Sequence, residues 1–306
     1  MARQLQLKET RVFAVKKLHS GNVRDSELFR HETDQLKRFN GHINPHLVTL
    51  LATFSQDGKH HFVFPFAEGD LCTYWESQRH LSTMNVEFAR WFAAQLSGLM
   101  DAICSIHDPN WDSLLVPQQK FGRHGDIKPD NILWYRSTSY SQGLFVISDL
   151  GLSAINSDKS RSNIPGQNVP PVPGYRPPEC DIEKASVSRL FDVWTMGCLY
   201  LEMTTWYLGG NELREEFEQR RCTTFLITGA NSNQFYNLKS FREDEGIFLQ
   251  FVKPEVTNVS EPMSTTSRIL DEQLTNASNL SGSTSFEPIR PVHSSFTLSS
   301  TSSRSI

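Results

Sequence analysis

Apolar residues in the first seventy positions occur in short runs separated by polar turns, a pattern typical of β-strands. Val12–Leu18 (VFAVKKL) is one such run, broken by two lysines. Leu47–Phe54 and His61–Phe66 are two more, and the turn signal Gln56-Asp57-Gly58 separates them. Between the first and second runs, Asp25–Phe39 places apolar residues among charges as on a helix with one buried face. This part therefore predicts strands with a single helix.

The pattern changes to a helical period after residue 70. Val86–Ile106 carries apolar residues at spacings of three and four, which predicts a long buried helix. Strands and one helix come first and mostly helix follows, so the order favours an α+β fold. We expect a small β-rich lobe, residues 1–67, joined near Ala67-Glu68-Gly69-Asp70 to a larger helical lobe, residues 68–254.

The last fifty residues carry neither period. From Glu255 to Ile306, 21 of 52 residues are Ser or Thr, and Trp and Tyr are absent. Such a segment buries too little apolar area to offset the loss of chain entropy on folding. We therefore expect residues 1–254 to fold and residues 255–306 to form a disordered Ser/Thr-rich tail. A loosely packed C-terminal subdomain is the alternative.

Composition and charge exclude several classes of protein. The 306 residues carry a formal net charge of −4, which is unlike a general nucleic-acid binder. No apolar run is long enough to span a membrane, and the first residues lack the apolar core of a signal peptide. The five cysteines are scattered and form no C-x-x-C pair, which argues against a disulfide framework or a zinc site. We expect an intracellular protein, cytoplasmic or nuclear, with no nucleic-acid or membrane partner.

One short string combines three kinds of polar side chain. In His124-Gly125-Asp126-Ile127-Lys128-Pro129-Asp130-Asn131 a carboxylate, an ammonium group and an amide follow one another within six residues. The Asp126 carboxylate can accept the proton of a hydroxyl nucleophile, and Lys128 can neutralise charge on a transferring phosphoryl group. The Asn131 amide oxygen can ligate a divalent cation. Taken alone, this string could also arise by chance.

Two further elements carry charge where apolar residues dominate. Asp149 ends the apolar run Leu144–Ser148 beside Gly151, and a carboxylate there suits Mg²⁺, although a solvated turn is the alternative. Lys16 lies inside an apolar strand and needs a counter-charge, which Glu32 on the following predicted helix can supply. Two independent surface charges are the alternative for this pair.

Together these strings resemble the eukaryotic protein kinase family over roughly residues 10–210. The family motifs V-A-I-K, H-R-D-L-x-x-x-N, D-F-G and A-P-E correspond in this chain to Phe13–Lys16, His124–Asn131, Asp149–Gly151 and Pro177–Glu179. A fifth match is Asp192–Gly197, similar to the D-x-W-x-x-G of a buried helix in that family. Lys128-Pro129 is the serine/threonine form of the loop, and "HGDIKPDNILW" is similar to the protein kinases of filamentous fungi.

The resemblance implies a bilobal kinase fold, ATP and Mg²⁺ as cofactors, and a protein substrate with a Ser or Thr acceptor. Asp126 would be the catalytic base and Lys128 a γ-phosphate contact. Asn131 and Asp149 would ligate Mg²⁺. Lys16, held by Glu32, would contact the α- and β-phosphates. Oligomeric state does not follow from the resemblance.

The resemblance also implies an adenine pocket between the lobes. Ala14 and Leu133 would enclose the adenine ring, and the hinge would be Pro65-Phe66-Ala67, which follows a bulky Phe64 at the back of the pocket. The Pro65 carbonyl could accept a hydrogen bond from adenine, and Ala67 retains both main-chain polar groups. A spine of four further side chains would couple the lobes: Leu36, Leu51, His124 and Leu150.

The chain departs from the family pattern in three places. Gly125 replaces the usual Arg, so ordering of the activation segment by one phosphate is not expected. Residues 1–20 contain no glycine, so the phosphate-covering G-x-G-x-x-G loop is missing. After Pro254 the Ser/Thr-rich stretch stands where lower-lobe helices, including an Arg partner for Glu179, would follow. We therefore expect a kinase core truncated at both ends.

These departures leave two alternatives open beside a protein kinase. One is a catalytically impaired pseudokinase or fragment that acts as a binding module. The other is a small-molecule phosphotransferase, because His124-Gly125-Asp126 also resembles the H-G-D of aminoglycoside- and choline-kinase-like enzymes.

Overall fold

The computed structural model describes thirteen stretches of the chain, all within one compact unit, Met1–Met263. These stretches are residues 12–17, 29–30, 32–34, 36–37, 44–78, 85–107, 120–150, 154–157, 164–165, 174–181, 186–225, 229–242 and 247–257. Residues 258–306 and the N-terminal residues 1–11 lie outside them, as does most of the predicted activation segment.

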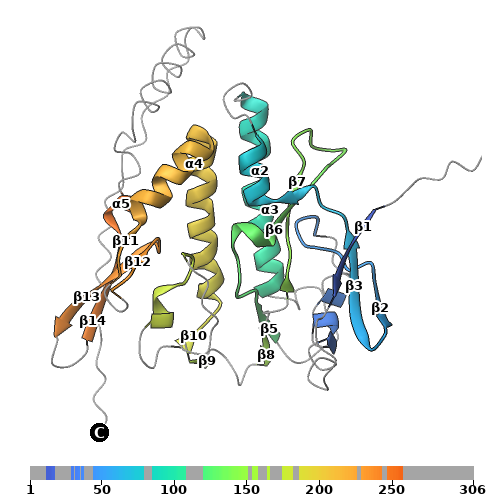
Figure 1. The fold of residues 1–306 in the computed structure, drawn as a ribbon, viewed down its shortest axis with the longest axis horizontal. Coiled ribbons are helices and arrows are strands. Elements are labelled where there is room, and N and C mark those ends of the chain that lie inside the picture. The colour runs from blue at the N-terminus through green and yellow to red at the C-terminus, as the bar shows by residue number, and fades with distance from the viewer. Residues whose placement is uncertain are drawn as a thin grey trace, which may run out of the picture. The chain divides into compact units, whose positions relative to one another are not determined.

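A three-stranded antiparallel sheet forms the N-terminal part (Figure 1). Its strands β1 (Phe13–Lys17), β2 (Ala52–Gln56) and β3 (Lys59–Pro65) pair in the order β1-β3-β2. Asp57 and Gly58 join β2 to β3 with φ angles of 52° and 71°. A two-residue turn with both residues left-handed matches the twist of a hairpin, as the Asp-Gly signal predicts.

The second predicted strand is too long at its start. Ala52 is the first residue of β2, whereas the segment before it runs to a different sheet. There Leu47 forms an isolated parallel bridge with Ile147, and the Val48 N–H donates to the Ile147 carbonyl at 2.9 Å. Contact with the C-terminal lobe therefore buries the start of this apolar run. The predicted strand is too long because apolar residues alone do not distinguish a strand from a buried segment that crosses between sheets.

The two faces of the N-terminal sheet differ in their surroundings. Phe62 of β3 is fully buried, and its ring centroid lies 5.0 Å from that of Phe29. Phe29 is part of the predicted helix, of which residues 29–30, 32–34 and 36–37 are described and helical. Leu36 and Glu32 on this helix are buried, whereas Phe13 and Phe54 on the outer face of the sheet are exposed. The helix thus covers one face of the sheet.

Three helices and a second three-stranded sheet build the C-terminal lobe. The helices are α2 (Leu71–Ser77), α3 (Val86–His107) and α4 (Leu190–Arg221). The sheet pairs β4 (Gly69–Asp70), β6 (Ile132–Tyr135) and β7 (Leu144–Ile147) in the order β4-β6-β7. Helix α3 confirms the long buried helix that the spacing predicts. An aromatic cluster of Tyr74, Trp91, Phe145 and Trp206 packs the helices against this sheet.

The remaining elements are short. They are η2 (Pro129–Asn131), η6 (Pro178–Asp181), α5 (Pro254–Thr257) and four antiparallel pairs: β5 (Lys120–Arg123) with β8 (Ala154–Ser157), β9 (Ile164–Pro165) with β10 (Ser186–Val187), β11 (Thr223–Thr224) with β12 (Asn231–Ser232), and β13 (Tyr236–Arg242) with β14 (Ile247–Val252).

The C-terminal lobe is less helical than its sequence pattern suggests. After Arg221 the described chain forms strands up to Val252. The reason is visible in β13, where Tyr236 and Leu238 are buried and alternate with the less buried Asn237. This period of two favours a strand, and pairing with β14 satisfies its main-chain groups. The α+β fold with a β-rich N-lobe is confirmed, and in the described residues the C-terminal lobe includes a β-hairpin, β13–β14, before α5.

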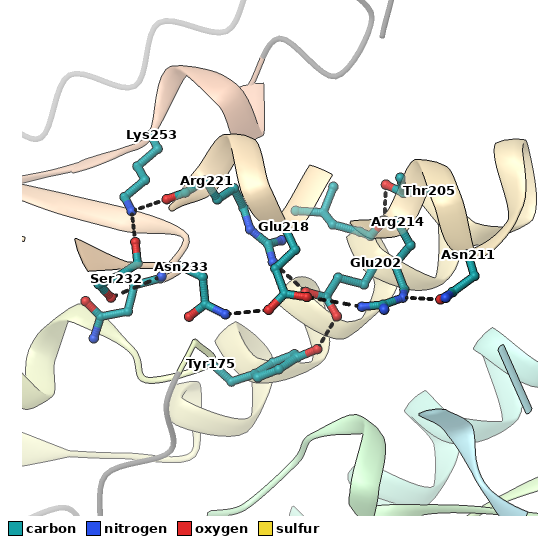
Figure 2. Close-up of polar contacts among 12 residues, drawn as sticks. Tyr175, Glu202, Thr205, Asn211, Arg214, Glu218, Arg221, Ser232, Asn233 and Lys253 are labelled. Carbon is teal, nitrogen blue, oxygen red and sulfur yellow. Dashed lines mark hydrogen bonds and ion pairs between the residues drawn. The ribbon is translucent and has the colours of Figure 1, made fainter. Parts of the chain in front are cut away.

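Buried charges attach this C-terminal segment to α4 (Figure 2). Helix α4 breaks at Gly209 and Gly210, whose backbone angles are not helical. The guanidinium of Arg221, after the break, lies 2.5 Å from Oε1 of Glu202, before it. The Tyr175 hydroxyl donates to the other oxygen of Glu202. Lys253 donates through Nζ to the carbonyls of Arg221 and Ser232 at 2.7 and 2.8 Å.

Helix α5 includes the first residues of the predicted Ser/Thr-rich tail. Val256 is buried in this short helix, so the fold continues past Glu255 as far as Thr257. The rest of the predicted tail lies outside the described residues. None of the helices in the described part of the chain is long and apolar enough to cross a membrane.

Candidate active site

A cavity of about 500 Å³ opens between the N-terminal sheet and the β4-β6-β7 sheet. Residues of β1, β3, the segment joining β3 to α2, and the ends of β6 and β7 line it. Eight of the ten site residues predicted from the sequence lie in its wall: Ala14, Lys16, Glu32, Pro65, Ala67, Asn131, Leu133 and Asp149. Asp126 and Lys128 are the other two. Asp126 contacts both Lys128 and Asn131, and Asn131 lines the cavity.

Lys16 lies between two carboxylates. Its Nζ is 2.8 Å from Oε1 of Glu32 and 2.8 Å from Oδ1 of Asp149. Burial lowers the pKa of the Lys16 ammonium, but the hydrogen bonds and charges of Asp149 and Glu32 outweigh this effect, so the pKa is raised overall. Lys16 is therefore a fixed cation at the cavity wall. The sequence predicts the contact with Glu32 but not the one with Asp149.

Asp126, Lys128 and Asn131 form one hydrogen-bonded group. The Lys128 Nζ lies 3.0 Å from Oδ2 of Asp126. The Asn131 side-chain nitrogen donates to the same Oδ2 at 2.8 Å and to the Asp126 carbonyl at 2.7 Å. Since the amide nitrogen is held in this way, the Asn131 Oδ1 is left as an acceptor. The short helix η2 and its N-cap Lys128 provide this arrangement by bringing residues two and five positions after Asp126 back toward it.

A buried aspartate fixes the backbone of the loop before Asp126. Asp192, at the start of α4, accepts from the main-chain N–H groups of His124 at 2.7 Å and Gly125 at 2.8 Å. His107 Nε2 lies 2.8 Å from the same carboxylate, and the His124 ring lies 2.9 Å from the Ser148 carbonyl. Gly125 has φ 82°, a region that favours glycine. The sequence motif singles out Asp192, but its contacts could not be predicted.

Asn131 and Asp149 fit a divalent cation. An amide oxygen and a carboxylate are hard ligands of the kind that Mg²⁺ prefers, and the Asp149 side chain is 46% exposed. Asp149 adopts φ 59°, a costly conformation that often marks functional sites. The described residues contain no group of three or more His, Cys, Asp or Glu that could hold a metal. The two residues would therefore share the cation with phosphate or water oxygens.

The segment that joins the lobes is tied to strand β6. The Glu68 N–H donates to the Trp134 carbonyl at 2.8 Å, and the Tyr135 hydroxyl donates to the Pro65 carbonyl at 3.3 Å. No described group bonds to the main chain of Ala67, which lies between them and lines the cavity. Tyr135 was missed from the sequence, since nothing in the string NILWYR shows which way a tyrosine side chain faces.

Three predictions about residues around the cavity have different outcomes. Leu36, His124 and Leu150 are buried as a spine requires, but Leu51 is 47% exposed, so its placement in the spine is wrong. Leu51 lies just before β2, where the chain emerges from its contact with β7.

Among the described residues no ion pair involves Glu179, and burial raises the pKa of its carboxyl. The missing glycine loop concerns residues outside the described part.

Comparison with known proteins agrees with these motifs. The sequence profile of the protein kinase domain matches residues 2–250. Serine/threonine-protein kinase SSN3 of Mycosarcoma maydis is 27% identical over 205 residues, which cover 65% of this chain and 26% of that protein. The kinase of the same name from Yarrowia lipolytica is 27% identical over 161 residues, 52% of this chain and 35% of that protein. Cyclin-dependent kinase 14 of Oryctolagus cuniculus is 25% identical over 170 residues, 55% of this chain and 30% of that protein. The chain spans about a quarter to a third of the length of these curated relatives.

Proposed function

Because the chain belongs to the family of protein kinase domains, we propose that it transfers the γ-phosphoryl group of ATP to serine or threonine hydroxyls of a protein. The observation that carries this proposal is the cavity at which Lys16, Glu32 and Asp149 meet beside the Asp126–Lys128–Asn131 group. We assign transfer to residues 1–254, with lobes 1–67 and 68–254, together with the short helix α5 that extends to Thr257, and we treat the stretch after Thr257 as a separate tail.

Asp126 is the proposed catalytic base. Its carboxylate is held by Asn131 and Lys128, so it can orient the substrate hydroxyl and take its proton. The hydroxyl oxygen forms a bond to the γ-phosphorus while the bond from that phosphorus to the bridging oxygen of ADP breaks. The Lys128 ammonium, 3.0 Å from Asp126, lies where it can stabilise charge on the phosphoryl oxygens.

Lys16 and the cation ligands are proposed to hold the phosphates. The raised pKa of Lys16 keeps it charged for contact with the α- and β-phosphates, while Glu32 fixes its position. Asn131 and Asp149 would hold Mg²⁺, which when bound neutralises phosphate charge. Ala14 and Leu133 line the cavity where they can enclose the adenine ring, and Pro65 and Ala67 border it at the hinge.

The joint presence of four polar residues suited to phosphoryl transfer favours an enzyme over a binding module. A module that only binds a partner does not require Lys16, Asp126, Asn131 and Asp149 to be present together. The match to serine/threonine kinases also argues against a small-molecule phosphotransferase, whose resemblance is limited to His124-Gly125-Asp126.

The decisive test is Mg²⁺-dependent transfer from radiolabelled ATP to a degenerate Ser/Thr peptide library by the purified full chain. We expect Asp126→Ala to reduce the rate by about 10²–10⁴-fold, because general-base catalysis contributes about that much. Asp101→Asn, an exposed carboxylate of α3, is the matched control and should leave the rate unchanged. Transfer that survives both Asp126→Ala and Asp149→Ala would contradict the proposal. Nucleotide binding without transfer in the unmodified chain would favour the binding module.

A further inference from the structure

A cavity of about 720 Å³ lies on the C-terminal lobe and shares no described lining residue with the candidate active site. The first half of α4 forms one wall. Phe235, Val252 at the end of β14 and Val256 of α5 line it as well. The proposed transfer reaction makes no use of this cavity.

The wall formed by α4 has the pattern of a helix face that packs against another helix. Its residues recur at the spacing i, i+3, i+4, i+7, i+8 and i+11, and they are Leu190, Val193, Trp194, Gly197, Cys198 and Leu201. Leu190 and Val193 are nevertheless 69% and 48% exposed. Gly197 lies in the middle of this face, and a Cβ atom added to it would contact nothing within 4 Å. Within the described part of the chain, the centre of this face thus has no packing partner.

The cavity also carries a charge that the described residues leave unpaired. Glu179 is the charged residue of the described lining, and it forms no ion pair with any described residue. The charge of Arg123 acts on it, but burial outweighs that effect, and the pKa of the Glu179 carboxyl is raised above its ordinary 4.5. A cation supplied by a bound partner would stabilise the ionised carboxylate.

These features favour a helix of another protein as the occupant. Val252, like Leu190 and Val193, is largely exposed at 43%, so the apolar surface is wider than a site that encloses a small molecule. A second copy of this chain would bring a second Glu179, and the described lining contains no cation that could pair with either carboxylate.

We propose that this cavity binds an amphipathic helix of a partner protein, which packs its apolar residues on the α4 face and pairs an Arg or Lys side chain with Glu179. The partner would dock on the helix that also carries Asp192, the residue that fixes the loop before Asp126.

The experiment selects binders on the full chain from a displayed library of helical peptides. Each peptide has about 15 residues, with leucines at intervals of three and four and with the flanking positions randomised. We expect selection to enrich Arg or Lys at one position beside the leucines. A selected peptide is then synthesised, and its dissociation constant is measured by fluorescence anisotropy.

Two variants test the apolar and the charged contact separately. Gly197→Leu places a side chain in the cavity where no described atom obstructs it, and it should weaken peptide binding by about tenfold or more. Glu179→Gln should weaken binding by about tenfold, the effect of losing one charge-assisted hydrogen bond. Ala93→Leu, which adds an apolar side chain at an exposed position of α3, is the matched control and should leave the dissociation constant unchanged.

Failure to enrich any helix, or binding that Gly197→Leu leaves unchanged, would overturn the assignment. If thermal melts show that Gly197→Leu does not fold, Val193→Asp at an exposed position of the same face takes its place. Selected peptides that lack Arg and Lys and bind Glu179→Gln equally well would overturn the charge pairing. A dimer of the unmodified chain in sedimentation, dissociated by Gly197→Leu, would assign the cavity to a second copy and overturn the proposal.

Discussion

Lys16 and Asp149 lie 133 residues apart in the sequence, yet the Nζ of the lysine is 2.8 Å from Oδ1 of the aspartate. One residue belongs to β1 of the N-terminal sheet, and the other follows β7 of the C-terminal lobe. The pair therefore links the two lobes at the cavity, and Glu32 forms a second ion pair with the same lysine.

Replacing Lys16 should slow phosphoryl transfer more than replacing any neighbouring lysine. In Lys16→Met the Glu32 and Asp149 carboxylates lose the cation between them, and the phosphates lose a positioned positive charge. We expect the transfer rate to fall by about 10²–10³-fold, as for loss of one electrostatic stabiliser. Lys17→Met, at the exposed adjacent position of β1, should change the rate little. Equal losses in the two variants would show that the strand, and not the charge, matters.

The buried pair between Arg221 and Glu202 should dominate the stability of the lower lobe. Arg221 is 1% exposed, its guanidinium lies 3.9 Å from the centroid of the Phe235 ring, and its loss leaves the buried Glu202 carboxylate without a cationic partner. Arg221→Met should lower the free energy of unfolding in urea by about 3–5 kcal/mol.

Arg220 provides the matched control in the same turn of α4. It pairs with Glu216 at 2.7 Å, but both side chains are partly exposed, so Arg220→Met should cost less than about 1 kcal/mol. Similar losses for the two arginine variants would contradict the role assigned to the buried network.

Glu179 should make stability depend on pH. Burial raises the pKa of its carboxyl above the ordinary 4.5, and this outweighs the opposing effects of its own main-chain N–H and of Arg123. The folded chain therefore binds this proton more tightly than the unfolded chain, so ionisation costs stability as the pH rises above about 4.5. Glu179→Gln should unfold at a higher temperature than the unmodified chain at pH 7. This advantage should shrink below pH 4.5.

Thermal melts between pH 4 and pH 8 test this expectation. The exposed Glu76 in α2 offers a control, since Glu76→Gln should shift the midpoint equally at every pH. A Glu179→Gln advantage that does not change with pH would show that the substitution acts through packing.

The five cysteines should fall into two reactivity classes. Cys104 and Cys222 are exposed. Burial raises the pKa of the Cys180 thiol to about 11 and that of Cys72 to about 12, and Cys198 is buried with a raised pKa. Because the thiolate is the reactive form, a disulfide reagent at pH 8 should modify two thiols rapidly in the native chain and five in urea. Rapid modification that persists in the Cys104→Ser, Cys222→Ser double variant would refute this assignment.

Much of the site could be predicted because its chemistry lies in short strings. Asp126, Lys128 and Asn131 fall within six residues, so the loop brings them together almost whatever the rest of the fold does. Lys16 in an apolar strand needs a counter-charge, and this requirement pointed to Glu32. Each of these inferences uses local spacing or an electrostatic necessity.

Other contacts depend on tertiary structure that no local pattern encodes. Whether Tyr135 faces the hinge is set by the pairing of β6 with β7. The ion pair of Glu202 with Arg221 crosses the break in α4, so helical periodicity could not predict it. Leu51 belongs to an apolar run, yet it is exposed because only the earlier part of that run contacts β7. The hairpin of β13 and β14 was overlooked because helices were expected after α4.

The break in α4 also restricts how the chain can change in length. Glu202 and Arg221 are 19 residues apart, and each added or removed helical residue rotates the remainder of the helix by about 100°. A single insertion between them would move the guanidinium away from Glu202 and from the Phe235 ring. Gly210, at φ 74° and ψ −168°, also occupies a conformation essentially reserved for glycine. We therefore expect homologous chains to keep this interval constant and to gain or lose residues in turns such as 136–143.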